Sequence, residues 1–576
     1  MSDIQNALDQ ILTFCDEYSE IQSLLLTYLD TSDNNQDTNS QNLSNLIQEL
    51  KKKKIEDDRS SLDDFLRMLV HIASNHHRSI DFFPKIANLL VSLKTEIQKY
   101  YSNEDLFNLF SHAEPVIVLL KDNLFQFTNE VNTIINSKDN QDLKQYYYPD
   151  DKKNEIENQK TGENHNQICT LIRLDEAPNL IDLVSHENIS LEAKIDPSPF
   201  ETNDFLKKHS EVTLLQYAAF CGSVAVFNHI SNAKPELLES DIWEYAIHGR
   251  NYEIINTLKE KTVSAPNDNY ESCLNLSISS HHSELIRTIQ DDLANPPENA
   301  EEEEEEKNDQ SVSPKYVLDP HLKTAIISHN YIEIASKLSS IKDEKDGILQ
   351  IFRKSNLYSD VPVRGINELF QVAAKYGFNK IVEILIKLPC ININYCGKYT
   401  ALQKACRIGD FSLAELLLKI DNIDINRKSI PHVSDINKDF DGLTALGIAV
   451  RYHNNSIVKL LLQQPNIDIN QRSQWISNTP LIAAAIYGNT EAATLLLKRE
   501  NIDLNHQSND RYSIQQNKVI AGGESALHSA CLYNHPEITK LLLSTSGIDV
   551  NLENWEGKKA FDCTEDPEIK ALFSNH

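Results

Sequence analysis

Cysteine and histidine are the residues of this chain with the most versatile chemistry, so their spacing is the first test for a reactive or metal-binding site. The sequence contains nine cysteines, no CxxC pair and no short cluster of cysteine with histidine, and its closest two cysteines are Cys390 and Cys396. Structural zinc sites are built from such short-range pairs. The pattern therefore predicts reduced thiols and no bound metal.

Three further cysteines lie in short apolar stretches that also contain alanine, namely Cys221, Cys406 and Cys531. A thiol in such surroundings behaves as a small hydrophobic side chain more often than as a nucleophile. Two pairs of adjacent histidines, His76 with His77 and His281 with His282, would point about 100° apart on a helix and have no third ligand at helical spacing. We interpret the cysteines as core residues and the histidines as packing or solvated residues.

Sequence motifs of the common catalytic sites do not occur in the chain. There is no GxxxxGK[ST], GxGxxG, HExxH or GxSxG pattern. The sequence therefore gives no indication of a phosphate-binding loop, a dinucleotide-binding fold, a zinc protease or a hydrolase nucleophile elbow. The sequence predicts a non-catalytic protein without a cofactor.

The elements that position the remaining candidate residues are repeats. Five copies are clear: ELFQVAAKYGFNKIVEIL from Glu368, TALQKACRIGDFSLAELLL from Thr400, TALGIAVRYHNNSIVKLLL from Thr444, TPLIAAAIYGNTEAATLLL from Thr479 and SALHSACLYNHPEITKLLL from Ser525. Four weaker copies precede them, from Thr213, Asp241, Ser272 and Pro320. Repeats that cannot bury their apolar faces alone must stack into an array.

Three positions of the repeat explain its residue types. Position one is Thr or Ser in the clear copies from Thr400 onward, whose hydroxyl can cap a helix. Position six is almost always small, which lets neighbouring helices approach closely. Position ten ends the first helix in a left-handed residue and holds Gly222, Gly377, Gly409, Gly488 and Asn534, with His453 as a departure.

These copies resemble the ankyrin repeat, with its T-P-L-H-x-A signature and a period of about 33 residues. Starts at Glu368 and Thr400 lie 32 residues apart and those at Thr444 and Thr479 lie 35 apart, while insertions follow NIDIN and NIDLN, where ankyrin repeats have their hairpin fingers. The text from about residue 167 also resembles a large ankyrin-bearing family expanded in certain anaerobic protists. The resemblance implies an all-α fold: an α-solenoid of ankyrin repeats with finger loops.

Positions eight and nine of the clear repeats form the candidate site. In a stack they would align tyrosines beside basic and aliphatic side chains, which are favourable contact residues for a protein partner. We expect Tyr399 and the two inserted fingers to flank the same groove. The alternative is that these tyrosines only shield neighbouring backbone. The candidate protein-binding residues are Lys375, Tyr376, Tyr399, Arg407, Ile408, Arg451, Tyr452, Ile486, Tyr487, Leu532 and Tyr533.

The chain divides into regions by composition. Helical spacing of apolar residues predicts a small helical N-terminal domain over 1–135, with an exposed loop from Thr31 to Ser44 and a capping box at Ser61. A polar linker is expected over 136–166; its three tyrosines, Tyr146 to Tyr148, form either a recognition motif or a patch packed on a neighbouring domain. Divergent ankyrin-like repeats follow over 167–366 and well-matched repeats with a C-terminal cap over 367–576.

The charge of the chain limits its partners. The formal net charge is −30, which disfavours nucleic acid and membrane surfaces, and no long apolar segment or signal peptide is evident. We place the protein in the cytoplasm. An acidic insertion near 295–312, with a run from Glu301 to Glu306, is expected to be a self-repelling loop, with a docking arm for a basic partner as the alternative.

The sequence therefore predicts a scaffold that binds a protein partner on the concave face of its ankyrin repeats. One alternative is a substrate adaptor of a multi-subunit enzyme such as a ubiquitin ligase, in which the N-terminal domain docks to the core. An enzyme is the third possibility and would need a catalytic cluster. Partner identity and oligomeric state are not specified by the sequence.

Overall fold

The structure, a computed structural model, describes most of the chain as two compact units. The described residues are 2–31, 36–76, 82–111, 113–121, 123–126, 128, 131–132, 135, 146–147, 160–161, 163–164, 166–196, 198, 201–209, 211–266, 270–293, 319–342, 361–395, 398–430, 442–474, 476–509, 511–513, 518–520 and 522–575. Unit 1 comprises Met1–Ile97, Phe110–Phe125 and Asp142–Val372, and unit 2 comprises Gln98–Leu109, Gln126–Gln141 and Ala373–His576. None of the helices in the described ranges combines the length and the hydrophobicity that crossing a bilayer requires.

The N-terminal part is helical, as predicted, although two local expectations were wrong. Its helices are α1 (Ser2–Asp30), α2 (Gln36–Lys52), α3 (Arg59–Asn75), α4 (Phe82–Ser92), α5 (Lys94–Tyr100), α6 (Asn103–Leu109) and α7 (Glu114–Leu120). The predicted loop after Thr31 is largely helix α2, which continues beyond Ser44 and buries the apolar Leu46 and Leu50 of its second half. Helix α3 is capped by Asp58, not by Ser61.

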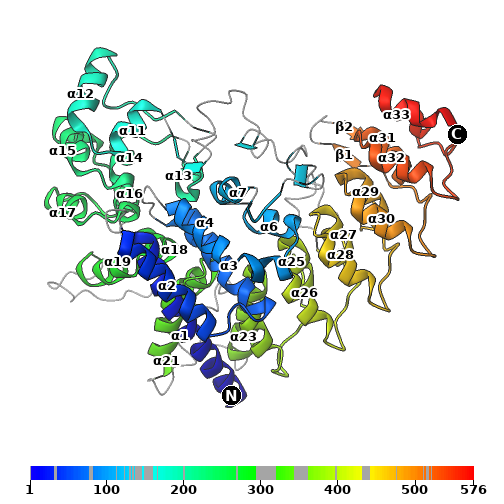
Figure 1. The fold of residues 1–576 in the computed structure, drawn as a ribbon, viewed down its shortest axis with the longest axis horizontal. Coiled ribbons are helices and arrows are strands. Elements are labelled where there is room, and N and C mark those ends of the chain that lie inside the picture. The colour runs from blue at the N-terminus through cyan, green and yellow to red at the C-terminus, as the bar shows by residue number, and fades with distance from the viewer. Residues whose placement is uncertain are drawn as a thin grey trace, which may run out of the picture. The chain divides into compact units, whose positions relative to one another are not determined.

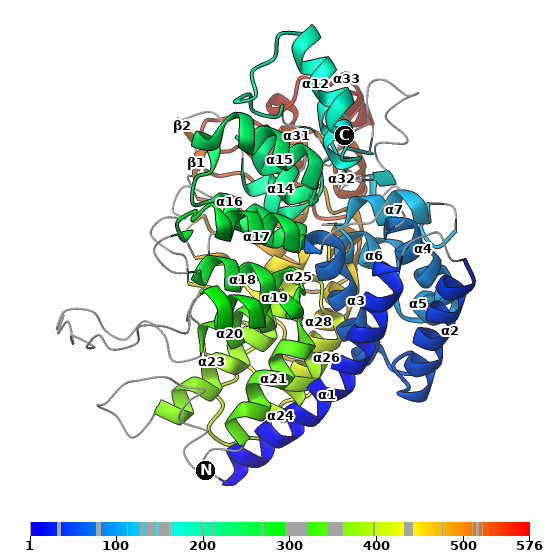
Figure 2. The same ribbon diagram turned by 90° about the vertical axis from the view of Figure 1, so that its left-hand side faces the viewer.

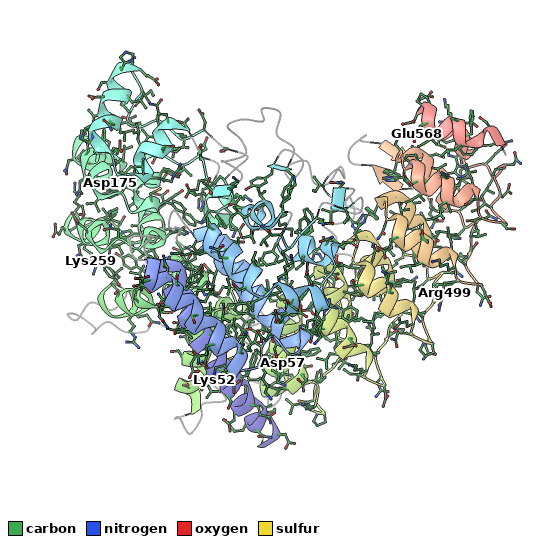
Figure 3. All side chains as sticks on the ribbon, viewed as in Figure 1. Lys52, Asp57, Asp175, Lys259, Arg499 and Glu568 are labelled. Carbon is green, nitrogen blue, oxygen red and sulfur yellow. The ribbon has the colours of Figure 1, made fainter. Side chains whose placement is uncertain are left out.

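The divergent repeats of unit 1 are pairs of short helices. They are α11 (Gln167–Arg173), α12 (Ala177–His186), α14 (Leu214–Cys221), α15 (Val224–Ala233), α16 (Ile242–Gly249), α17 (Tyr252–Glu260), α18 (Glu271–Ser279), α19 (Ser283–Thr288), α20 (Pro320–Ile327) and α21 (Tyr331–Lys342), with the short α13 (Asp204–Lys208) between the first pairs. Asp175, labelled in Figure 3, caps α15 by accepting from the backbone N–H groups of Ala225 and Val226. First helices contact the next first helix along α14, α16, α18 and α20, as stacking requires.

Helix α1 packs lengthwise against the divergent repeats of unit 1. Figure 2 shows α1 alongside α21, and the two helices share extensive contacts. Tyr18 and Phe14 of α1 pack on Tyr331, with ring centroids 4.7 and 5.8 Å apart respectively. Gln22 of α1 lies 3.0 Å from both the Nδ1 of His281 and the Oδ1 of Asn330. The N-terminal helix therefore supplies part of the core that these repeats lack.

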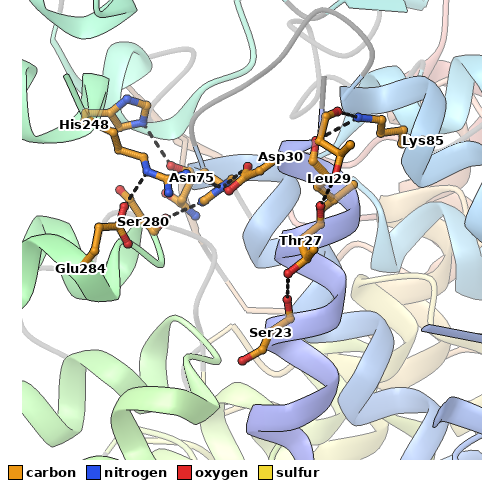
Figure 4. Close-up of polar contacts among 12 residues, drawn as sticks. Ser23, Thr27, Leu29, Asp30, Asn75, Lys85, His248, Ser280 and Glu284 are labelled. Atoms are coloured by element: carbon orange, nitrogen blue, oxygen red, sulfur yellow. Dashed lines mark hydrogen bonds and ion pairs between the residues drawn. The ribbon is translucent and has the colours of Figure 1, made fainter. Parts of the chain in front are cut away.

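A polar network joins the end of α1 and the end of α3 to position ten and its neighbours (Figure 4). Arg250 donates to Asp30 at 2.9 Å and to Glu284 at 2.8 Å. His76 bridges the carbonyl of Ser280 and the carboxylate of Asp30, at 2.8 and 3.0 Å. Burial alone would raise the pKa of Asp30, but hydrogen bonds and charges from His76 and Arg250 lower that pKa to about 2.

Unit 2 contains the well-matched repeats as an ordered series of helix pairs (Figure 1). They are α24 (Asn379–Leu385), α25 (Ala401–Ile408), α26 (Phe411–Leu418), α27 (Ala445–Arg451), α28 (Asn455–Leu462), α29 (Pro480–Tyr487), α30 (Thr490–Leu497), α31 (Ala526–Leu532), α32 (Pro536–Leu543) and α33 (Pro567–Leu572); α23 (Val361–Tyr376) spans the boundary between the units. First helices α25, α27, α29 and α31 contact in sequence, as do second helices α26, α28, α30 and α32.

The three repeat positions behave as predicted. Thr400, Thr444, Thr479 and Ser525 cap their helices through the side chain. Every small residue at position six is fully buried. Position ten has a positive φ in all the copies with Gly, in Asn534 and in His453, whose φ is 56°. Arg250, His281 and His329 occupy the same left-handed position in unit 1, which their residue types did not predict.

Two ladders of side-chain amides join the repeats of unit 2. The last asparagine of each finger motif accepts from the Asp N–H of the next motif and donates to that motif's first carbonyl; Asn426, for example, contacts Asp468 N and Asn466 O at 2.9 and 2.8 Å. At position eleven, Asn454 donates to Cys406 O and Asn489 donates to Val450 O. These bonds fix the distance from one repeat to the next.

The second insertion contains a short hairpin. Strands β1 (Arg511–Ser513) and β2 (Lys518–Ile520) pair antiparallel, with Tyr512 opposite Val519. The acidic run from Glu301 to Glu306 lies outside the described residues, and so does most of the first insertion.

Candidate functional site

The last turns of the first helices bring the predicted positions eight and nine together. Each first helix of unit 2 starts at its cap and ends at or next to these positions: α25 ends at Ile408, α27 at Arg451, α29 at Tyr487 and α31 at Leu532. Because consecutive first helices are in contact, the side chains at their ends are neighbours across repeats.

Five of the predicted residues form an alternating row, which we call the tyrosine–arginine ladder: Tyr399, Arg407, Tyr452, Arg451 and Tyr487. The guanidinium carbon of Arg407 lies 5.6 Å from the ring centroid of Tyr399 and 5.8 Å from that of Tyr452. The guanidinium carbon of Arg451 lies 5.8 Å from the Tyr452 centroid and 4.8 Å from the Tyr487 centroid. These are cation–π distances, so each ring holds an arginine in place.

Accessibility differs along the ladder. Arg407 is exposed, and Tyr452, Arg451 and Tyr487 are half-buried. Tyr399 is only 7% exposed. We expected Tyr399 to flank the groove as a contact residue, but its burial makes it a support for the Arg407 side chain.

The other predicted residues lie at equivalent helix ends, outside the ladder. Lys375 is exposed and its ammonium sits 4.7 Å from the ring centroid of the adjacent Tyr376. Ile408 and Ile486 are half-buried, Tyr533 is half-buried, and Leu532 is 36% exposed. The expectation that the inserted fingers flank the same groove falls largely on residues that the structure does not describe.

Sequence reasoning missed a segment of the N-terminal region that belongs to unit 2. Helix α6 contacts the turn that follows Tyr452: Asn455 donates to Glu104, Ser456 donates to Asp105 at 2.9 Å, and Asn108 donates to Asn454 at 3.1 Å. The polar triplet Asn454 to Ser456 was a signal in the sequence, but nothing in it indicates a partner more than 300 positions away.

The predicted core thiols are poor nucleophiles. Burial raises the pKa of Cys531 to about 12, and it raises the pKa of Cys406 and Cys221 well above the usual value. A thiolate is needed for nucleophilic attack, so these residues suit packing. Across the described ranges no three His, Cys, Asp or Glu side chains are grouped as metal ligands would be. His281 and His282 are buried, His76 is buried and hydrogen-bonded to Ser280 and Asp30, and His77 lies outside the described residues.

Comparison with known proteins identifies the repeats. A family profile described as "Ankyrin repeats (3 copies)" matches residues 370–473 and again 473–554. The helix pairs, caps and finger motifs of unit 2 agree with this match. Residues 370–554 are therefore ankyrin repeats, and the predicted α-helical solenoid fold is confirmed. Comparison with curated proteins gives no significant match.

Proposed function

We propose that this ankyrin repeat protein is a non-catalytic scaffold that binds a protein partner on the face carrying the tyrosine–arginine ladder. Ankyrin repeats in general are modules of protein–protein interaction. The observation that supports this particular surface is the alternation of tyrosine rings and arginines across three successive first helices. Tyrosine and arginine are the residue types that most often dominate binding energy.

The geometry suits binding because the ladder is held rigidly before a partner arrives. The helix cap fixes where a first helix begins, and so where its last turn carries the ladder residues. The bonds from Asn454 and Asn489 to the preceding repeat fix the spacing between ladder residues of successive repeats. Stacking on tyrosine rings restricts the arginine rotamers. Less side-chain entropy is then lost on association than with free arginines.

The other two functions have less support. An enzyme needs a reactive group, and the thiols at hand have a raised pKa, while ankyrin repeats are typically non-catalytic. An adaptor needs a free docking surface on the N-terminal helices, but in unit 1 the Tyr18 and Gln22 side of α1 packs on the chain's own repeats. No observation specifically favours the adaptor, so the scaffold is the proposal.

Site-specific photocrosslinking tests this proposal. Benzoylphenylalanine replaces Tyr452 in the full chain, and a matched chain carries it in place of Tyr252, which is 45% exposed on helix α17. We expect a defined protein to crosslink from position 452, and to lose its crosslink when Tyr487→Ala is added. Equal crosslinking from both positions, or none from position 452, would contradict the assignment.

A further inference from the structure

The described contacts of Arg407 in unit 2 are two tyrosine rings and no carboxylate. Several lysines on or just beyond the second helices have carboxylate partners: Lys380 and Lys387 pair with Glu383, and Lys459 pairs with Glu491. Within the described part of the chain, by contrast, no carboxylate lies within ion-pairing distance of Arg407, whose contacts are the rings of Tyr399 and Tyr452.

Stacking on the rings leaves the N–H donors of the Arg407 guanidinium accessible. A guanidinium stacked on aromatic faces keeps its N–H donors in the plane of the group, where they can bind the two oxygens of a carboxylate as a fork. Arg407 is exposed, and its two rings hold it in one orientation. The next guanidinium, that of Arg451, lies 5.8 Å from the ring centroid of the same tyrosine, Tyr452. It supplies a second positive charge along the row.

On the basis of the proposed function, we infer that the tyrosine–arginine ladder recognises an acidic peptide segment, one of whose Asp or Glu carboxylates binds Arg407. Charge complementarity supports this occupant, because the ladder carries two arginines and, among the described residues, no carboxylate pairs with Arg407. A nucleic acid could also stack on tyrosines and contact arginines. The net charge of −30 disfavours it, since a polyanion with one charge per phosphate is repelled more strongly than a segment with a few carboxylates.

The test is binding of a short fluorescein-labelled peptide of alternating glycine and glutamate to the full chain, followed by anisotropy. Peptides with glutamine in place of glutamate and a labelled oligothymidine are the comparison ligands. We expect saturable binding of the glutamate peptide only, weakened about tenfold by Arg407→Ala, as loss of a charge-assisted hydrogen bond predicts. Arg407→Lys should recover only part of the affinity, because lysine keeps the charge but not the planar fork.

The matched control is Arg499→Ala, which removes an exposed arginine beyond the end of helix α30, labelled in Figure 3, whose guanidinium donates to the carbonyl of Leu462 and contacts no ladder ring. It should bind the peptide as the wild type does, and the two Arg407 variants should keep the wild-type thermal unfolding curve. Binding that falls equally in both alanine variants, no binding of the glutamate peptide, or binding of oligothymidine at Arg407 instead would overturn the inference. If Arg407→Ala leaves unchanged the binding of the protein that crosslinks from position 452, the acidic-peptide inference fails while the proposed function stands.

Discussion

At the scale of single residues, position ten of the repeat shows what the sequence reveals and what it hides. Glycine and Asn534 at this position predicted a left-handed residue, and the structure confirms it. Arg250, His281 and His329 adopt the same conformation, which is uncommon for large side chains. Their conformation was not predicted because the contacts that offset its strain are long-range: Arg250 pairs with Asp30, and His281 is hydrogen-bonded to Gln22.

His281 leads to a prediction on pH. Burial lowers the pKa of His281 well below its usual value, and the charges of His76 and His71 lower it further, against a hydrogen bond to Ser328. An unfolded histidine takes up a proton below about pH 6.5 while folded His281 stays neutral, so unfolding becomes easier as the pH falls. His281→Asn keeps a residue type that tolerates the left-handed conformation and removes this titration.

The measurement is the thermal unfolding temperature of the full chain at about pH 7.5 and about pH 5.5. We expect a smaller decrease on acidification for His281→Asn than for the wild type. His186→Asn, at an exposed position of helix α12, should decrease as much as the wild type does. An unchanged pH dependence in His281→Asn would show that His281 does not contribute.

At the scale of elements, the finger motifs do more than mark insertions. The sequence identified NIDIN as the place where residues are inserted. It did not reveal the ladder, because the hydrogen bonds join residues 30 to 44 positions apart. Asn394, Asn426, Asn470 and Asn505 each bond to the following motif in the same way. The first helices, by contrast, could be predicted because their caps and apolar spacing are local.

The asparagine ladder predicts a specific loss of stability. Asn426→Ala removes a bond to Asp468 N and a bond to Asn466 O, and should lower the free energy of unfolding by about 1 to 2 kcal/mol. Asn422→Ala is the matched control in the same motif, because Asn422 joins the ladder through its backbone carbonyl. Urea unfolding compares them. Equal free energies for the two variants would mean that the ladder adds no stability.

At the scale of the whole molecule, the N-terminal region is part of the fold of each unit. Spacing predicted that residues 1–135 are helical, yet it could not show which surfaces those helices cover. In unit 1, α1 packs on α21, and in unit 2, α6 contacts Asn455 and Ser456. The divergence of the repeats from Asp241 to Pro320 is understandable from this packing, because part of their stabilising contacts comes from outside the repeat.

Deletion of residues 1–97 tests that dependence. The repeats over α16 to α21 should lose protection in hydrogen exchange, because Tyr331 and Asn330 lose Tyr18 and Gln22. Helices α29 to α32 should keep the protection that they have in the full chain, since their contacts are with adjacent repeats. Uniform loss across both regions, or full protection of α16 to α21, would contradict this explanation.

The central claim is that the tyrosine–arginine ladder binds a protein partner. The most direct test is the dissociation constant of the protein crosslinked from position 452, measured by calorimetry with the wild type and with the double variant Tyr452→Ala/Tyr487→Ala. Loss of the two tyrosine rings should weaken binding by at least about 2 kcal/mol, while the thermal unfolding temperature remains nearly unchanged. Wild-type affinity in the double variant, or its unfolding, would show that these tyrosines are structural and that the surface is wrongly assigned.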